Sequence, residues 1–257
     1  MKTNIAKSKV SQGHVAIGTL CTTASALMAE ALGHAGYDFV VVDLQHGENN
    51  LGNVQHMLQA VSATPAMPFV RVPANVPVYI QRALDLGAYG IVIPLLDDVQ
   101  DAEAAVASVR YAPAGARSWG PVRGAMYGGP DYFDFAHEEL VVLAMIETAA
   151  GLRNARRIME VSGIDGCFIG PNDLAISIGE RPEQRRWPDK VEEAITTILA
   201  ATSAAGKASG IQCFGEEEAR MRIDAGFRYV SVQSDLRMAR AAATATLDVL
   251  RHQGGTA

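Results

Sequence analysis

The sequence predicts a (β/α)8 barrel, and three observations carry this prediction. Short apolar runs alternate with amphipathic segments along the whole chain, which is typical of parallel sheets covered by helices. Eight strand–helix units fit into 257 residues, the usual size of such a barrel. Each strand precedes its helix, as right-handed crossovers require. A doubly wound open sheet is the alternative. The absence of G-x-G-x-x-G after the first strand disfavours its dinucleotide-binding form.

The strands are expected where short apolar or β-branched runs end in polar residues, glycine or proline. They cover residues 14–20, 38–43, 67–73, 90–95, 140–147, 163–170, 208–214 and 227–232. A segment with helical spacing follows each of them, and residues 234–252 form the last helix. A loop is expected at 181–189. We find no domain boundary, so 1–257 is predicted to be a single barrel domain.

The alternation is interrupted at about residues 112–138, where the chain is rich in Gly, Pro and aromatic residues. Irregular segments of this length in compact domains are usually functional or disordered. Its arginines and aromatic residues favour an ordered, functional excursion from the barrel over a linker.

Composition excludes several classes of protein. The net charge of −6 and the pI of about 5.5 argue against nucleic-acid binding. Three widely spaced cysteines indicate reduced thiols and a cytoplasmic location. The lysines near the start precede no apolar segment, so no secretory signal is expected, and no run of 18 apolar residues could span a membrane.

Polar side chains follow most of the predicted strands, and in a barrel such residues face one mouth. They are Asp43 and His46, Arg71, Glu147, the segment Gly170, Pro171, Asn172 and Asp173, Gln212 and Gln233. A candidate base, a fixed cation and two isolated carboxylates therefore converge from different strands.

Glu147 and Asp173 follow neighbouring strands and could share one divalent cation. Oxygen sites with few protein ligands and several waters suit Mg²⁺ or Mn²⁺. Taken singly, each carboxylate could instead cap the helix that follows it. Their position at the mouth with His46 and Arg71 favours metal binding.

His46 is either a polar loop residue or a base whose ring Asp43 orients. Arg71 follows an apolar run, so its burial requires an anion. Glu48, Asp85 or a substrate carboxylate or enolate could supply that anion.

Other chemistries lack their residues. None of the five lysines ends a strand at the mouth, which disfavours a Schiff-base mechanism. Glu216, Glu217 and Glu218 crowd the turn after the seventh strand, which disfavours phosphorylated substrates. The chain has no G-x-S-x-G elbow.

Several segments, in order along nearly the whole chain, resemble the HpcH/HpaI aldolases. They are YDFVVVDLQHGENN, PFVRVP, ALDLGAYGIVIPL, GARSWGPVRG, AMIET and GIDGCFIGPNDLAISIG, the last being the most specific. These aldolases are metal-dependent (class II) enzymes of the phosphoenolpyruvate/pyruvate barrel superfamily. The resemblance implies cleavage of a 4-hydroxy-2-oxo acid to pyruvate or hydroxypyruvate and an aldehyde.

The resemblance also implies roles for residues of this chain. Glu147 and Asp173 would hold Mg²⁺, Mn²⁺ or Co²⁺. His46 would be the base, supported by Asp43 and Asp85. Arg71 would contact the oxo group of the substrate. The backbone at Gly170, Pro171, Asn172 and Asp173 would contact the carboxylate. Trp119 and Arg123 would contact the aldehyde. Gln212 is a further substrate-binding candidate. A homotrimer or homohexamer is implied, with helix 234–252 packed on a neighbouring subunit.

The chain departs from the family pattern at two positions. Gln45 stands where many relatives have Glu, beside His46, and Met145 stands where many have Gln, two residues before Glu147. Neither change removes a metal ligand. Two rival functions remain open: an acyl-CoA lyase similar to the citrate lyase β subunit, for which Arg117 and Arg123 would contact the CoA phosphates, and a barrel that binds an oxo acid without catalysis.

Overall fold

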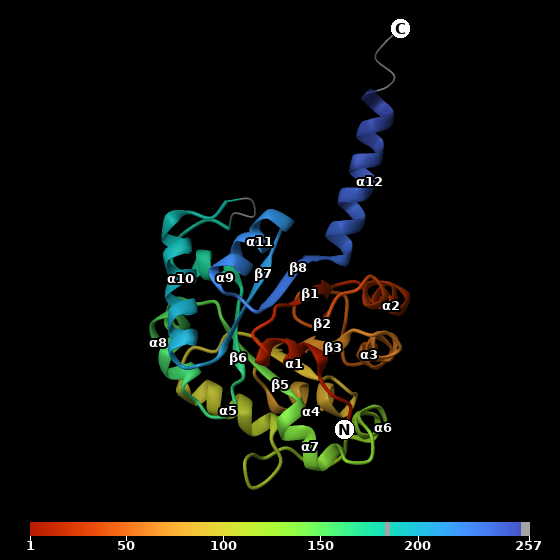
Figure 1. Cartoon of the computed structure of the whole chain (residues 1–257), viewed down its shortest axis with the longest axis vertical. Coiled ribbons are helices and arrows are strands. Elements are labelled where there is room, and N and C mark those ends of the chain that lie inside the picture. The colour runs from red at the N-terminus through yellow and green to blue at the C-terminus, as the bar shows by residue number, and fades with distance from the viewer. Residues whose placement is uncertain (183–185, 253–257) are drawn as a thin grey trace.

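The computed structural model contains a closed barrel of parallel strands in the order β1 to β8, which β8 closes by pairing with β1 (Figure 1). The structure describes residues 1–182 and 186–252. The prediction of a (β/α)8 barrel is confirmed, and the open-sheet alternative is wrong. The strands are β1 (Ala16–Cys21), β2 (Phe39–Asp43), β3 (Met67–Arg71), β4 (Gly90–Ile93), β5 (Val141–Ile146), β6 (Gly166–Ile169), β7 (Ala208–Cys213) and β8 (Tyr229–Ser234).

Helices surround the barrel, and their apolar faces pack on the outward-facing strand residues. The helices are α1 (Ile5–Ser11), α2 (Ala26–His34), α3 (Val54–Ser62), α4 (Pro77–Asp85), α5 (Val99–Val109), α6 (Val122–Gly128), α7 (Tyr132–Glu139), α8 (Ala149–Met159), α9 (Pro171–Ser177), α10 (Asp189–Ala204), α11 (Glu216–Ala225) and α12 (Asp235–His252). None of the described helices is long and apolar enough to cross a membrane.

Large aromatic side chains fill the barrel interior. Phe39 and Phe69 stack with ring centroids 4.9 Å apart, and Tyr229 packs edge-on against Phe39. The barrel is narrow at this level, so the facing positions must be small. A Cβ added at Gly18 would lie 2.3 Å from the Phe39 ring, and one at Gly90 would lie 2.5 Å from the Phe69 ring. These two glycines therefore make room for the aromatic layer.

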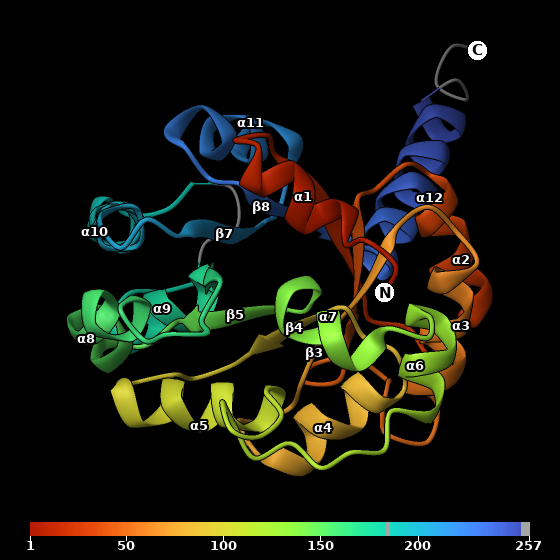
Figure 2. The ribbon, with the colours of Figure 1, turned by 60° about the horizontal axis from the view of Figure 1, so that its bottom comes forward.

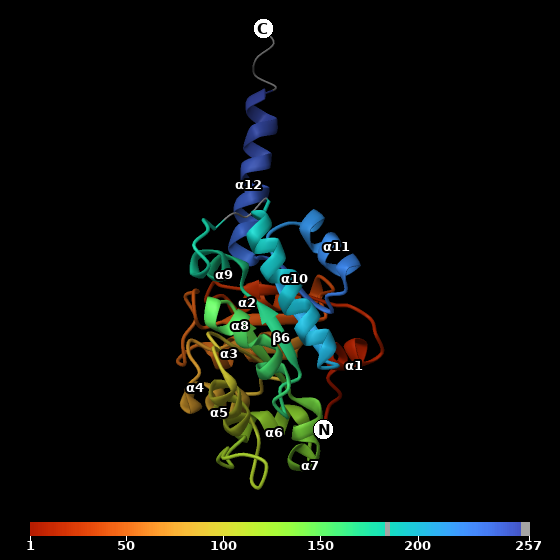
Figure 3. The same cartoon turned by 90° about the vertical axis from the view of Figure 1, so that its left-hand side faces the viewer.

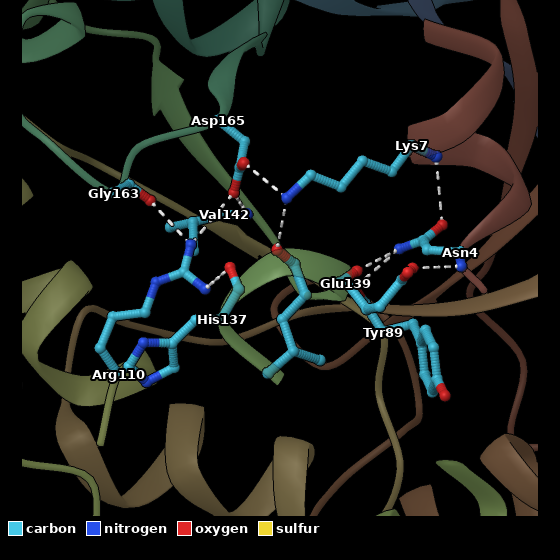
Figure 4. Close-up of polar contacts among 10 residues, drawn as sticks. Asn4, Lys7, Tyr89, Arg110, His137, Glu139, Val142, Gly163 and Asp165 are labelled. Atoms are coloured by element: carbon cyan, nitrogen blue, oxygen red, sulfur yellow. Dashed lines mark hydrogen bonds and ion pairs between the residues drawn. The ribbon is translucent and has the colours of Figure 1, made fainter. Parts of the chain in front are cut away.

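An additional helix, α1, closes the end of the barrel where the strands begin. The Lys7 Nζ lies 2.9 Å from Asp165, which also pairs with Arg110 at the end of α5 (Figure 4). The Asn4 side chain caps α1 and donates to the Glu139 carbonyl at the end of α7. Sequence analysis did not predict α1, because its seven residues contain too few turns to show a helical period.

The excursion at 112–138 is ordered, as expected, but it is not wholly irregular, since it contains α6 and α7. Both helices lie at the amino-terminal end of the barrel, and α7 lies beside α1 (Figure 2). Their glycines and aromatic residues mask a helical pattern. Tertiary contacts hold them, including the bond from Arg117 to the Tyr132 hydroxyl at 3.2 Å.

The predicted strands differ from the observed ones only at their ends, by up to three residues. The largest single difference is at 163–170, where β6 begins at Gly166, and the strand predicted at 227–232 is shifted by two residues at both ends. Residues 183–185 of the expected loop at 181–189 lie outside the described part of the chain.

Helix α12 begins at the mouth of the barrel and extends beyond the rest of the molecule (Figure 3). Asp235, which is 2% exposed, anchors its first turn. The carboxylate accepts hydrogen bonds from the backbone N–H and the hydroxyl of both Thr22 and Thr23, at 2.5–3.0 Å. These bonds tie the end of β8 to the end of β1, whereas residues 239–251 of the helix are exposed.

Replacement of Asp235 is expected to destabilise the protein most at neutral pH. Burial raises the pKa of Asp235, but the hydrogen bonds from Thr22 and Thr23 outweigh it, so the pKa lies below its ordinary value. The ionised carboxylate therefore contributes stability above the unfolded-state pKa of about 4, and this contribution is lost as the pH falls through the folded-state pKa. Asp235→Asn should lower the free energy of unfolding at pH 7 by about 1–3 kcal/mol.

Denaturant unfolding from pH 7 down to about pH 3 measures this difference, which should shrink below about pH 4. Asp224→Asn, on the exposed surface of α11, is the matched control. A difference that is independent of pH would contradict the assignment.

Candidate active site

The mouth of the barrel holds a cavity of about 560 Å³, within the range of small-molecule sites. Eight of the predicted site residues line it: Asp43, His46, Arg71, Gly170, Pro171, Asn172, Asp173 and Gln212. They lie in or follow four different strands, β2, β3, β6 and β7, because the carboxyl ends of parallel barrel strands meet at one face.

Asp43 and Arg71 form a two-pronged ion pair at the floor of the cavity. They are register neighbours at the ends of β2 and β3. The Arg71 Nε and Nη2 donate to the two Asp43 oxygens at 2.8 and 2.6 Å, and Asp43 is fully buried. The anion that neutralises Arg71 is therefore Asp43, rather than Glu48 or Asp85. The geometry fixes the guanidinium while its remaining N–H groups can meet a substrate.

His46 lies at the edge of the cavity, in the loop after β2, with its side chain exposed. Its backbone N–H donates to Asp43 Oδ1 at 3.4 Å, and the N–H of Gln45 donates to the same oxygen at 3.0 Å. We expected Asp43 to orient the His46 ring. Instead, Asp43 accepts hydrogen bonds from the backbone of this loop, and both of its oxygens accept hydrogen bonds from Arg71 on the neighbouring strand.

Glu147 directly follows β5 and is 1% exposed. Its Oε1 accepts a hydrogen bond from the Leu95 N–H at 3.0 Å, while its Oε2 is buried without a partner among the described residues. Burial raises the pKa of Glu147 to about 7; the Leu95 hydrogen bond opposes this shift, and the charge of Asp173 adds to it. A nearby cation would relieve the cost of ionising this carboxyl group.

The donor set fits a hard divalent cation. Asp173 lies in the first turn of α9, at the cavity, and its charge acts on Glu147. A Cβ at Gly170 would lie 2.3 Å from Glu147 Oε2, so glycine keeps the space beside that oxygen open. The described residues contain no cluster of three or more His, Cys, Asp or Glu that could hold a metal. Water and substrate oxygens would complete the coordination of Mg²⁺ or Mn²⁺.

The alternative that these carboxylates are helix caps fails for Glu147. Thr148 is the N-cap of α8, and its hydroxyl accepts from the Gly151 N–H at 2.9 Å. Gly170 is the N-cap of α9, so Asp173 lies inside the helix rather than at its cap.

The two positions that depart from the family pattern have different surroundings. Gln45 Oε1 is buried without a hydrogen-bond partner within the described chain. Met145 lines the cavity below Glu147 and is 1% exposed, so it makes this part of the floor apolar. Gln212 contributes an amide from β7 to the same cavity; it donates to the Gln233 carbonyl at 3.1 Å.

Three predicted residues do not reach the mouth of this chain. Asp85 ends α4 and pairs with Arg117 at 2.9 Å. Arg123 donates to the carbonyl of Leu86, directly after α4. Trp119 packs in the same excursion and is 59% exposed. Helices of a barrel end beside the starts of the next strands, so all three lie at the opposite end from the cavity.

Sequence analysis missed three features around the cavity. Thr22 and Thr23 line it and bind Asp235. Arg237, from the first turn of α12, lines its outer part. The C-T-T after the first strand and the S-D-L-R after the eighth could have identified these residues. Leu95 has a positive φ of 57°, which turns its N–H toward Glu147, and no sequence signal marks it.

Comparison with known proteins shows extensive similarity to one family. The family model described as HpcH/HpaI aldolase/citrate lyase matches residues 17–242. The chain is 40% identical over 232 residues to the hydroxypyruvate/pyruvate aldolase of Rhizorhabdus wittichii, covering 90% of this chain and 92% of that protein. It is 35% identical over 247 residues to the 5-keto-4-deoxy-D-glucarate aldolase of Klebsiella pneumoniae, covering 95% and 96% of the two chains.

Solved structures agree with this similarity. An HpcH/HpaI aldolase/citrate lyase family protein from Burkholderia cenocepacia superimposes with a TM-score of 0.90 at 35% identity, over 97% of this chain and 100% of the other. The citrate lyase β subunit from Mycobacterium tuberculosis reaches a TM-score of 0.60 at 20% identity, over 88% of this chain and 95% of the other, and so shares the fold alone. The chain therefore belongs to the HpcH/HpaI aldolase/citrate lyase family, and it is an aldolase, a carbon–carbon lyase, within that family.

Proposed function

We propose that this aldolase reversibly cleaves a 4-hydroxy-2-oxo acid to pyruvate or hydroxypyruvate and an aldehyde, with a divalent metal ion at Glu147 and Asp173. One observation carries the proposal: Glu147 Oε2, a buried carboxylate oxygen with no hydrogen-bond partner among the described residues, lies beside Gly170 at the cavity that His46 and the fixed Arg71 line. The names of the two relatives support the choice of oxo acids.

Glu147 and Asp173 would hold Mg²⁺, Mn²⁺ or Co²⁺, which when bound would act as a Lewis acid toward the oxo group of the substrate. The residues from Gly170 to Asp173 form the start of α9, whose free N–H groups suit the substrate carboxylate. These contacts orient the oxo acid with its C2 oxygen toward Arg71.

In the direction of synthesis, His46 or a water beside it accepts a proton from C3 of the oxo acid. Negative charge then develops on the C2 oxygen, and the Arg71 guanidinium stabilises it from a position that Asp43 fixes in advance. C3 attacks the aldehyde carbon, and the proton returns to the new alkoxide. Cleavage runs through the same steps in reverse.

The acyl-CoA lyase alternative loses the two arginines on which it was based. They were expected near the mouth, where they would contact the CoA phosphates. Arg117 is buried against Asp85, and Arg123 binds backbone carbonyls at the other end of the barrel. A barrel that only binds an oxo acid would not need the buried carboxylate pair and the preset guanidinium together.

We further propose a homotrimer or homohexamer in which α12 packs on a neighbouring subunit. Apolar side chains on its outer part are exposed in the single chain, among them Leu247 at 47% and Leu250 at 63%. An exposed apolar helix face of this length is typical of an interface. In such an assembly, only Asp85 of another copy could support His46, because Asp85 of the same chain lies at the opposite end of its barrel.

Removal of the metal should abolish pyruvate release. Treatment with EDTA is expected to stop cleavage, and added Mg²⁺, Mn²⁺ or Co²⁺ should restore it. Glu147→Gln should weaken Mn²⁺ binding at least about tenfold, measured directly by electron paramagnetic resonance, because the amide offers no negative charge. Glu160→Gln, on the exposed end of α8, is the control. Normal Mn²⁺ affinity in Glu147→Gln would refute the metal site.

Arg71→Gln should lower kcat by about 10²–10³-fold, since it removes a donor to the developing negative charge. The control variant Arg82→Gln, at an exposed position of α4, should change kcat little. Steady-state kinetics with a coupled pyruvate assay measure both. If Arg71→Gln raised only KM, Arg71 would bind the ground state rather than stabilise the reaction.

Replacement of the two exposed leucines of α12 should disrupt the assembly. The double variant Leu247→Glu and Leu250→Glu is expected to reduce the particle mass in solution, because charge in an apolar interface is costly. Light scattering after size-exclusion chromatography measures the mass. Thr196→Glu, at an exposed position of α10, serves as the control. An unchanged mass would show that α12 is not in the interface.

A further inference from the structure

A separate cavity of about 350 Å³ lies at the amino-terminal end of the barrel, opposite to the mouth. Asp165, Lys207 and Arg228 directly precede the neighbouring strands β6, β7 and β8, and all three line this cavity. Lys7 lines it from α1, the helix that closes this end of the barrel. No described residue lines both this cavity and the one at the mouth.

Positive charge predominates in and beside this cavity. Among the described residues that line it, Lys7, Lys207 and Arg228 are cations and Asp165 is the one carboxylate. Arg110 adds a fourth cation, with its Nη2 3.5 Å from Asp165 Oδ2. The whole chain has a net charge of −6, so the local charge here opposes the global charge.

The carboxylate of Asp165 is already shared between several partners. Its Oδ1 lies 2.9 Å from the Lys7 Nζ, and its Oδ2 accepts from the Val142 N–H at 2.8 Å and pairs with Arg110 (Figure 4). These contacts hold α1 and the end of α5 to the barrel, and stability is the usual role of residues at this face. They explain Lys7 and Arg110, but neither Lys207 nor Arg228.

Lys207 and Arg228 retain hydrogen-bond donors. The Lys207 Nζ donates to the Val161 carbonyl at 2.7 Å, which uses one of its three N–H groups. The Arg228 Nη1 donates to the Phe227 carbonyl at 3.0 Å, whereas its Nε and Nη2 make no hydrogen bond with the described residues. Neither side chain forms an ion pair with a carboxylate in the described part of the chain.

The electrostatic surroundings of Lys207 also favour an anion. Burial lowers the pKa of Lys207, and the charge of Asp165 opposes this shift only in part. A second negative charge in the cavity would therefore stabilise the protonated amine.

The donor set fits a phosphoryl group better than a single carboxylate. The edge of a guanidinium offers two parallel N–H groups to phosphate oxygens, and a lysine adds a point charge. A phosphoryl group carries a charge of about −1.5 to −2 and three strong acceptor oxygens, so different cations can each meet one oxygen. A carboxylate has half the charge and two oxygens.

We propose that this cavity is a phosphate-binding site, in which Lys207 and Arg228 contact the phosphoryl oxygens and Lys7 adds its charge. The ligand is inorganic phosphate or a small phosphate ester. A bound ligand would join the starts of β7 and β8 to α1. The site is independent of the proposed aldolase function, because it lies at the opposite end of the barrel from Glu147 and Arg71.

The test is calorimetric titration of the full-length protein with inorganic phosphate, after removal of divalent cations and at constant ionic strength set with sodium chloride. The wild-type protein should bind phosphate saturably. Arg228→Gln and Lys207→Gln should each weaken binding at least about tenfold, because a charged donor to the anion is lost. Arg228→Lys should recover part of the affinity, since it keeps the charge but not the planar pair of donors.

Two control variants locate the site. Arg220→Gln, at an exposed position of α11, should change the phosphate affinity less than about twofold. Arg71→Gln removes a cation at the mouth and should also leave the affinity unchanged. Glycerol 3-phosphate as a second titrant distinguishes the ligands: tighter binding than phosphate would assign the site to an ester, and equal or weaker binding would assign it to free phosphate.

Three results would overturn the proposal. The first is the absence of saturable phosphate binding when sodium chloride maintains the ionic strength. The second is a loss of binding in Arg71→Gln with unchanged affinity in both Arg228→Gln and Lys207→Gln, which would place the anion at the mouth. The third is an equal loss in Arg220→Gln, which would show a general effect of net charge.

Discussion

The burial of Glu147 is the constraint on which the rest of the mouth depends. This carboxylate is 1% exposed, and one of its oxygens has no hydrogen-bond donor in the part of the chain that the structure describes. Such burial is costly unless a cation lies beside the oxygen. Two features of the fold nevertheless maintain this buried carboxylate. Leu95 adopts a left-handed backbone conformation to donate to one oxygen, and Gly170 leaves space beside the other. Strain and missing side-chain volume at one point are typical of functional sites.

The second constraint at the mouth is the positive charge of Arg71, which Asp43 neutralises. An arginine among apolar strand residues needs an anion, and Asp43 supplies it from the neighbouring strand in exact register. Because the pair is formed before substrate binds, the proposed stabilisation of negative charge by Arg71 would require little reorganisation of the site. The site thus combines an anionic side, Glu147 and Asp173, which needs a cation, with a cationic side, which is already neutralised and rigid.

The barrel and much of the site could be predicted because parallel strands place the residues after them at one mouth. Asp43, Arg71 and Asp173 reach the cavity for that reason, and Glu147 lies beside it. The partner of Asp43 depends on strand register, which the sequence does not reveal. Asp85 was expected at the mouth through family resemblance, although its place at the end of a helix puts it at the opposite end. Helix α1 is too short for a pattern and depends on Lys7 and Asp165.

We propose that the Glu147–Asp173 pair and Arg71 together stabilise negative charge on an oxo acid. The most direct measurement is proton NMR of deuterium exchange at C3 of pyruvate, without aldehyde, before and after removal of divalent cations. We expect exchange that stops on chelation, resumes with Mn²⁺ and is strongly slowed in Arg71→Gln even when Mn²⁺ is saturating. Exchange at an undiminished rate in the metal-free enzyme would contradict it.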